Sequence, residues 1–161
     1  MSGITRKSPA EVALMRRAGA VVAEVLALVE QLAVPGASTA EIDAAAERHI
    51  LAAGASSNFK GYHGFPSVIC LSIDNEVVHG IPGEREIKLG ALVSVDAGAI
   101  IDGWHADAAR SFYVGEAPPE AARLIRVTRE ALEALVADAA GGDGVSSAGD
   151  RRKDARRFKV V

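Results

Sequence analysis

The chain has 161 residues, of which 49% are hydrophobic and 24% are charged, and its net charge is −3. This composition is typical of one folded, soluble domain and excludes a chain that is disordered throughout. A single cysteine, Cys70, excludes an intramolecular disulfide and a zinc site made of cysteines alone. Glu24 and Glu30 interrupt the most apolar stretch, and charged residues interrupt the N-terminal one, so we expect neither a membrane span nor a signal peptide. The expected location is the cytoplasm.

Charge is unevenly distributed along the chain. Residues 150–161 carry six Lys or Arg and two Asp, a local balance of +4, which leaves −7 on the other 149 residues. A basic segment on an acidic body can mark a nucleic-acid contact, but at a terminus it is more often a solvated end. We therefore expect no specific nucleic-acid partner.

The spacing of apolar residues predicts two amphipathic helices at the start of the chain. The first begins at a capping box, residues 8–11, with proline at the first helical position, and ends at 34–36. The second begins at another capping box, residues 38–41, and runs to Gly54. The predicted buried stripe of the first helix consists of Val12, Met15, Val22, Val25, Leu26, Val29 and Leu32.

An antiparallel sheet and a third helix follow in the predicted order. The predicted strands are residues 68–73, 76–79, 91–101 and 104–114. Asp102-Gly103 is a strong signal for a two-residue hairpin between the last two of them. The third helix begins at Pro118-Pro119 and ends at Gly141-Gly142, with an apolar side of Leu124, Ile125, Leu132, Leu135 and Val136.

This order of elements predicts an α+β fold. The predicted domain covers residues 1–142. Residues 143–161 contain few apolar side chains and no clear period, so we expect them to form a basic, disordered tail.

The predicted hairpin places two carboxylates close together. If Asp102-Gly103 is the loop, Gly98 faces Asp107 across the strands, and alternation puts Asp96 on the same face. Asp96 and Asp107 are then diagonal neighbours, about 7 Å apart or less at Cβ. Two such carboxylates repel each other unless a proton or a cation intervenes, and oxygen ligands suit Mn, Mg, Fe or Zn. The alternative is a pair of unrelated, solvent-facing aspartates.

Other residues could contact a substrate. His79 follows a Val-Val pair and could donate a hydrogen bond or accept a proton near neutral pH. The alternative is a histidine that caps a turn. Tyr62, His63 and Phe65 could line a pocket for an unbranched apolar side chain, with Cys70 as a small, soft wall. The alternative is an ordinary aromatic turn packed on the sheet. His49 and His105 are expected to be structural or exposed.

Four blocks in sequence strongly resemble type I methionine aminopeptidase: GYHGFP at 61–66, NEVVHGIP at 75–82, VDAG at 95–98 and DGWHAD at 102–107. The SPAE start at 8–11 and MRRAG at 15–19 also resemble the first helix of that family. The resemblance covers about residues 5–138.

The resemblance implies the N-terminal half of a pita-bread fold and the removal of initiator methionine from nascent proteins. Asp96 and Asp107 match the first two metal ligands, and His79 matches a catalytic histidine that contacts the substrate near the scissile amide. Tyr62, His63, Phe65 and Cys70 match the methionine side-chain pocket and its rim. The implied cofactors are two divalent metal ions, cobalt, manganese, iron or zinc. The implied partners are the N-termini of nascent polypeptides, which the protein could meet at the ribosome. The protein is expected to be a monomer and to have no membrane partner.

The remaining ligands of that family, a histidine and two glutamates, have no match after Asp107. The chain leaves the family pattern at about Asp138, as a truncated gene or an altered reading frame would produce. We therefore expect the polypeptide as written to be marginally stable, weak in metal affinity and inactive. Two alternatives stay open: a non-catalytic pita-bread binding module, and a proline-specific peptidase relative.

Overall fold

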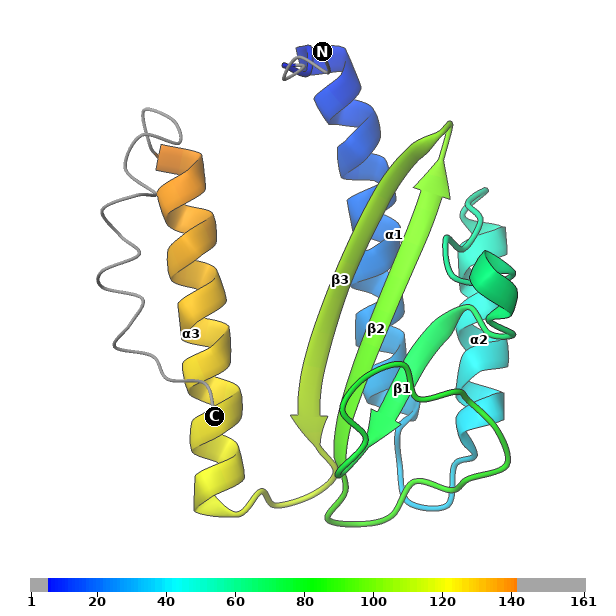
Figure 1. Cartoon of the computed structure of the whole chain (residues 1–161), viewed down its shortest axis with the longest axis vertical. Coiled ribbons are helices and arrows are strands. Elements are labelled where there is room, and N and C mark those ends of the chain that lie inside the picture. Colours follow the sequence, from blue (N-terminus) through cyan, green and yellow to red (C-terminus); the bar gives the residue numbers. More distant parts are fainter. Residues whose placement is uncertain (1–5, 142–161) are drawn as a thin grey trace. The chain divides into compact units, whose positions relative to one another are not determined.

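The computed structural model describes residues 6–141, and their side chains up to residue 138. The chain divides between Ala117 and Pro118 into two compact units. The first holds α1 (Pro9–Leu32), α2 (Thr39–Ala52), the 3-10 turn η1 (Tyr62–Gly64), β1 (Ile69–Ile73), β2 (Leu92–Ile101) and β3 (Trp104–Tyr113), and the second holds α3 (Pro119–Gly141) (Figure 1). The predicted α+β class is confirmed. The predicted tail, residues 143–161, lies outside the described residues.

Both predicted capping boxes are confirmed. The backbone N–H of Ser8 donates to the Glu11 carboxylate at 2.7 Å, and the N–H of Glu11 donates to Ser8 Oγ at 3.3 Å. Ser38 and Glu41 repeat this exchange at the start of α2. These reciprocal bonds satisfy N–H groups that the first helical turn cannot pair internally, so each helix begins where local chemistry stabilises its end.

The buried stripe of α1 is shifted toward its C-terminal part. Its buried residues are Ala18, Val21, Val22, Val25, Leu26 and Val29. The prediction that Val12 and Met15 are buried is wrong, because they are 37% and 39% exposed. The N-terminal turns of α1 extend beyond the hairpin end of the sheet, so no strand within residues 6–141 covers them (Figure 1).

The sheet has the order β1-β2-β3, with both pairs antiparallel. Helix α1 packs against β2 and β3, and α2 packs against α1 and β1. Val93, Val95, Ala97 and Ala99 of β2 are buried in this core. Because side chains alternate along a strand, Ser94, Asp96, Gly98 and Ile100 face the side of the sheet opposite to the core helices.

The predicted returning strand at 76–79 is wrong, because residues 74–91 form an irregular connection between β1 and β2. Asp74 and His79 have left-handed φ values of 54° and 58°, which an extended strand does not allow. The Glu76 carboxylate accepts a hydrogen bond from the N–H of Ile73 at 2.8 Å, and this bond turns the chain away from β1. The partner of β1 is β2 instead.

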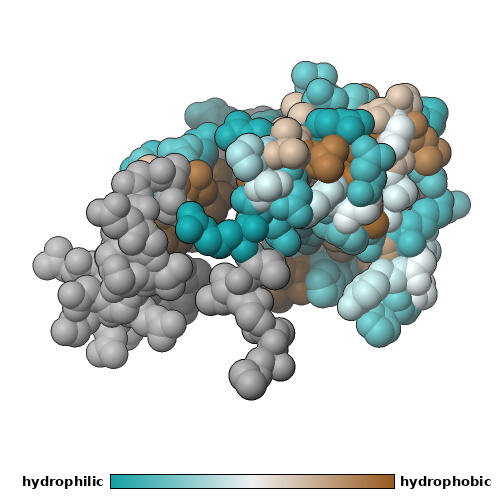
Figure 2. Space-filling view, turned by 90° about the horizontal axis from the view of Figure 1, so that it is seen from above, coloured by the Kyte–Doolittle hydropathy of each residue, from teal (hydrophilic) through white to brown (hydrophobic). Residues whose placement is uncertain are grey.

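The third predicted helix is confirmed as α3. Arg126 pairs with Glu130 at 3.0 Å within it, one turn apart. The side chains of Leu124, Leu132, Leu135 and Val136 are exposed. None of the helices between residues 6 and 141 is long and apolar enough to cross a membrane. Seen from above, the surface carries apolar side chains set among hydrophilic ones (Figure 2).

Asp43 of α2 holds the start of β1 in place. Its Oδ1 accepts hydrogen bonds from the N–H groups of Val68 and Ile69, at 3.0 and 3.1 Å. We expect Asp43→Ala to lower the free energy of unfolding by about 1–3 kcal/mol, because it leaves both N–H groups without an acceptor. Asp43→Asn keeps an acceptor and is the matched control. Urea unfolding measures both, and an alanine variant as stable as the wild type would contradict the assignment.

Burial raises the pKa of Asp43 above its ordinary value of 3.8, against the opposing effect of its two hydrogen bonds. The folded state therefore holds this proton more tightly than the unfolded state does. The contribution of Asp43 to stability consequently falls as pH rises from the ordinary pKa to the raised one. We expect Asp43→Asn to remove this fall in a series of unfolding measurements between about pH 3 and 7.

Candidate metal and substrate site

The hairpin between β2 and β3 has the predicted turn. Asp102 and Gly103 have φ values of 50° and 78°, as the two central residues of a type I′ turn require. The register pairs Gly98 with Asp107 and Asp96 with Ala109, so the predicted register is confirmed. Asp96 and Asp107 are therefore diagonal neighbours on the face that is not covered by the core helices.

The electrostatics of the two aspartates favour a cation. Burial raises the pKa of Asp96, and the negative charge of Asp107 raises it further, whereas His79 lowers it. Asp96 Oδ1 is buried and has no hydrogen-bond partner among the described residues. Asp107 is exposed. Within residues 6–138, no group of three or more His, Cys, Asp or Glu side chains is placed to hold a metal ion, so the pair could supply only part of a metal site.

His79 is held by a close approach of its neighbour to β1. The N–H of Leu71 donates to the carbonyl of Gly80 at 2.8 Å, and the N–H of Gly80 donates to Ser72 Oγ at 3.0 Å. A Cβ on Gly80 would lie 2.4 Å from the carbonyl oxygen of Leu71. Only glycine fits here without a shift of the backbone, so Gly80 allows the loop to close on β1 and present His79.

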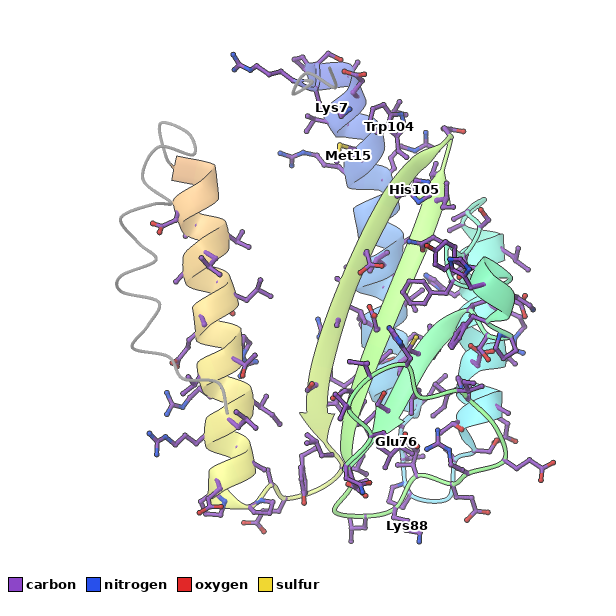
Figure 3. The ribbon with its side chains drawn as sticks, viewed as in Figure 1. Lys7, Met15, Glu76, Lys88, Trp104 and His105 are labelled. Atoms are coloured by element: carbon purple, nitrogen blue, oxygen red, sulfur yellow. The ribbon has the colours of Figure 1, made fainter. Side chains whose placement is uncertain are left out.

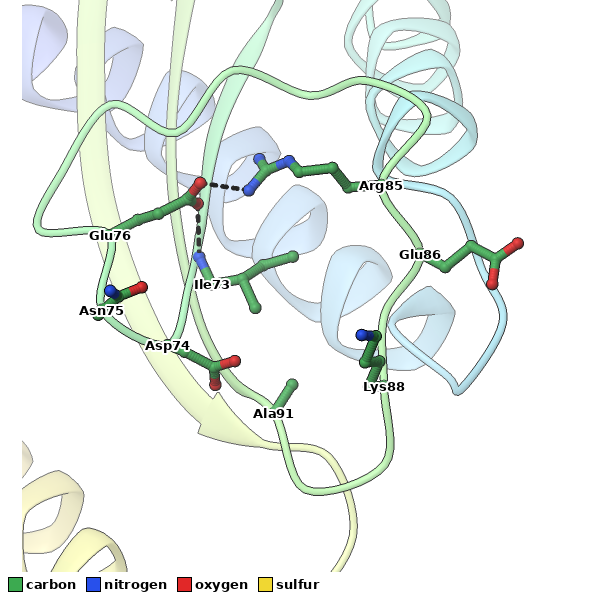
Figure 4. A pocket seen from close by; sticks show the side chains of 8 residues that line it. All are labelled: Ile73, Asp74, Asn75, Glu76, Arg85, Glu86, Lys88 and Ala91. Carbon is green, nitrogen blue, oxygen red and sulfur yellow. Dashed lines mark hydrogen bonds and ion pairs between the residues drawn. The ribbon is translucent and has the colours of Figure 1, made fainter.

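A second anchor fixes the same loop (Figure 4). The Arg85 guanidinium pairs with the Glu76 carboxylate and donates to the carbonyl of Ile81 at 3.1 Å. Glu76 and Arg85 border a cavity of about 410 Å³, whose lining also includes Asp74 and Lys88. Because Glu76 and Arg85 are bonded to each other and to the chain around them, their evident role is to support the loop that carries His79.

A larger cavity, of about 800 Å³, contains most of the predicted site residues. It is lined by Asn58, Phe59, Tyr62, His63, Gly64, Phe65, Pro66, Cys70, His79, Ile81, Asp96 and His105. The structure thus brings the whole predicted pocket, Tyr62, His63, Phe65 and Cys70, to one cavity with His79 and Asp96. Asp107 is not among the residues that line it.

The aromatic rim of this cavity is a tight turn. Gly61, His63 and Gly64 have positive φ values of 87°, 47° and 81°. The rings of Tyr62 and His63 meet edge to face, with centroids 4.3 Å apart. Glycines supply the backbone conformations that the turn needs, and the turn then directs several rings toward one cavity.

Cys70 is a buried thiol, as predicted, and is 6% exposed. Burial raises the pKa of Cys70 to about 11, and the negative charges of Asp96, Asp107 and Asp43 contribute. A thiol with so high a pKa is almost entirely protonated at neutral pH, so Cys70 is suited to forming a wall and not to acting as a nucleophile.

Several residues that line the cavity are not identified by the sequence patterns. His105, expected to be structural or exposed, is both exposed and part of the lining. Its pairing with Ile100 places it on the Asp96 face, as the predicted register of the hairpin also does. Figure 3 places His105 near the hairpin end of β3, beside Trp104, whose ring lies 5.3 Å from Lys7 Nζ. Asn58 carries no comparable signal. His49, by contrast, pairs with Glu24.

Residues 13–157 match metallopeptidase family M24. The chain belongs to this family. It is 45% identical over 129 residues to a methionine aminopeptidase of Clostridium perfringens, covering 80% of this chain and 52% of the relative. It is also 48% identical over 127 residues to one of Clostridium acetobutylicum, covering 78% and 51%, respectively. The chain thus spans about half the length of these M24 relatives.

Solved structures give the same result for the fold. Methionine aminopeptidases from Rickettsia prowazekii and Thermotoga maritima match with TM-scores of 0.77 and identities of 34% and 38%. Each match covers 81% of this chain and 53% of the other. Prolidase from Pyrococcus furiosus matches with a TM-score of 0.66 at 18% identity, which shows a shared fold alone. The predicted half of a pita-bread fold is confirmed by these matches.

Proposed function

We propose that this M24 chain supplies the methionine-binding pocket and two metal ligands of a methionyl aminopeptidase. The observation that carries the proposal is the cavity in which the apolar wall of Phe65 and Cys70 meets His79 and Asp96. A flexible thioether side chain is bound well by apolar contacts with few polar anchors. Asp96 and His79 line the same cavity, so a peptide whose side chain occupied that wall would have these polar groups beside its backbone.

His79 and the two aspartates would have separate roles. His79 can donate a hydrogen bond to a carbonyl or accept a proton near neutral pH. Asp96 and Asp107 would hold divalent ions, with cobalt, manganese, iron and zinc as candidates, and the unpartnered Oδ1 of Asp96 fits this role. A divalent ion, when bound, supplies polarisation of the scissile carbonyl.

The two carboxylates alone leave such ions short of ligands. Each divalent ion takes about four to six donors, and within residues 6–138 no group of three or more His, Cys, Asp or Glu side chains is placed to hold a metal ion. This observation favours, as a second candidate, a module that binds peptide or metal without catalysis. We expect no release of methionine from Met-Ala-Ser by the purified chain with Mn²⁺ or Co²⁺. Release that Asp107→Ala abolishes would contradict this expectation.

The biological setting follows from the proposed substrate. Nascent polypeptide N-termini would be the partners, encountered in the cytoplasm and at the ribosome by a monomer. We propose neither a membrane nor a specific nucleic acid as a partner.

Peptide binding tests the proposed function. We expect Met-Ala-Ser to shift the NMR signals of Phe65, Cys70 and His79, and Gly-Ala-Ser to bind at least about tenfold more weakly because it lacks the side chain that the wall accepts. Phe65→Ala should remove this difference, whereas Tyr113→Ala, outside the cavity lining, should not. Equal binding of the two peptides would contradict the proposal. Preferred binding of an Xaa-Pro dipeptide would favour a proline-specific relative instead.

A further inference from the structure

Asn58 lines the cavity without a role in the proposed function. Its position follows from an isolated bridge, in which Ser56 and Ile100 exchange backbone hydrogen bonds of 3.0 and 2.8 Å. Continuing this antiparallel register by two residues places Asn58 opposite Gly98. A Cβ on Gly98 would lie 1.9 Å from Asn58 Oδ1. The carboxamide therefore occupies the space that the missing Gly98 side chain leaves on the Asp96 face of the sheet.

The Asn58 carboxamide oxygen lacks a donor. Asn58 Oδ1 and Asp96 Oδ1 are both buried without a hydrogen-bond partner among the described residues, and both residues line the same cavity. Leaving a buried acceptor unpaired is unfavourable. Two acceptor oxygens beside the negative charges of Asp96 and Asp107 are complementary to a cationic group with several N–H donors.

We infer that Asn58 Oδ1 accepts a hydrogen bond from the protonated α-amino group of a peptide bound in this cavity. The inference rests on the proposed function and adds a specificity-determining residue to it. An ammonium group has three N–H donors, so one of them can serve Asn58 Oδ1 whether or not a divalent ion occupies Asp96. With the first side chain on the Phe65 and Cys70 wall, this contact selects a free N-terminus over a ligand without an amino group.

The test separates the amino group from the rest of the ligand. Binding of Met-Ala-Ser is compared with that of 4-(methylthio)butanoyl-Ala-Ser, which lacks only the amino group, by NMR titration of the chain in EDTA. We expect the wild type to prefer the free amine. Asn58→Ala should reduce that preference about tenfold, equivalent to about 1.4 kcal/mol, with unchanged affinity for the des-amino peptide. Asn75→Ala removes an exposed carboxamide outside the cavity and should leave the preference unchanged.

Gly98→Ala tests the contact between Asn58 and the amino group independently. Its added methyl group must displace the Asn58 carboxamide, so this variant should also lose the preference, and it should have little further effect when Asn58 is already alanine. If both peptides bind and neither variant changes the preference, the inference about Asn58 is overturned and the proposed function stands. If the wild type binds neither peptide, both are overturned.

Discussion

Replacing Asp96 or Asp107 is expected to abolish the metal binding of this chain. Substoichiometric Mn²⁺ should broaden the NMR signals of residues 96–98 and 105–107 in the wild type, because Asp96 and Asp107 share one face of β2 and β3. Asp96→Asn and Asp107→Asn each remove one of two charged oxygen ligands, so the broadening should disappear from both variants. Paramagnetic broadening detects weak sites, which suits a pair with so few donors.

The matched control for this experiment is Asp102→Asn. Asp102 lies in the same hairpin and is paired with Arg17 at the surface, so its replacement changes the net charge equally at a distance from the pair. We expect it to leave the broadening intact. Broadening that persists in both Asp96→Asn and Asp107→Asn would contradict the shared metal site.

The metal-free stability of the same variants separates a lost site from a lost fold. Burial and the charge of Asp107 raise the pKa of Asp96, so the ionised pair is unfavourable in the folded chain without a cation. Asp96→Asn and Asp107→Asn should therefore raise the free energy of unfolding in EDTA at neutral pH. A gain of stability together with a loss of metal binding is the pattern expected of a functional pair.

The elements that could be predicted from the sequence are those whose chemistry is local. The two capping boxes and the Asp102-Gly103 turn involve residues no more than three apart, and each specifies its backbone conformation directly. The register of β2 and β3 then follows from the turn by counting. For this reason the juxtaposition of Asp96 and Asp107 can be argued from the amino-acid sequence alone.

The features that could not be predicted depend on distant contacts. Val77-Val78 has the composition of a strand, yet Arg85 and Gly80 fold this segment into a loop by bonding to β1. Asn58 contacts Gly98 only because Ser56 pairs with Ile100, which lies 44 residues later in the sequence. The residue pattern of neither segment predicts these contacts. Strand propensity is misleading for Val77-Val78 and gives no prediction for Asn58.

In the loop between β1 and β2, Gly80→Ala is expected to impair both stability and peptide binding. An added Cβ would lie 2.4 Å from the Leu71 carbonyl oxygen and 2.8 Å from Ser72 Cα, and neither backbone atom can move without distorting β1. We expect the free energy of unfolding to fall by about 1–3 kcal/mol, as in other overpacked sites. Because the loop must separate from β1, His79 should shift, and Met-Ala-Ser should bind more weakly even where the variant remains folded.

Gly83→Ala is the matched control, since a Cβ at Gly83 meets nothing within 4 Å and lies in the same loop. It should change the free energy of unfolding by no more than about 0.5 kcal/mol and leave peptide binding intact. Urea unfolding and NMR titration of both variants give the comparison. If Gly80→Ala and Gly83→Ala behave alike, the close approach of Gly80 to β1 does not position His79, and the loop is held by the Arg85 and Glu76 pair instead.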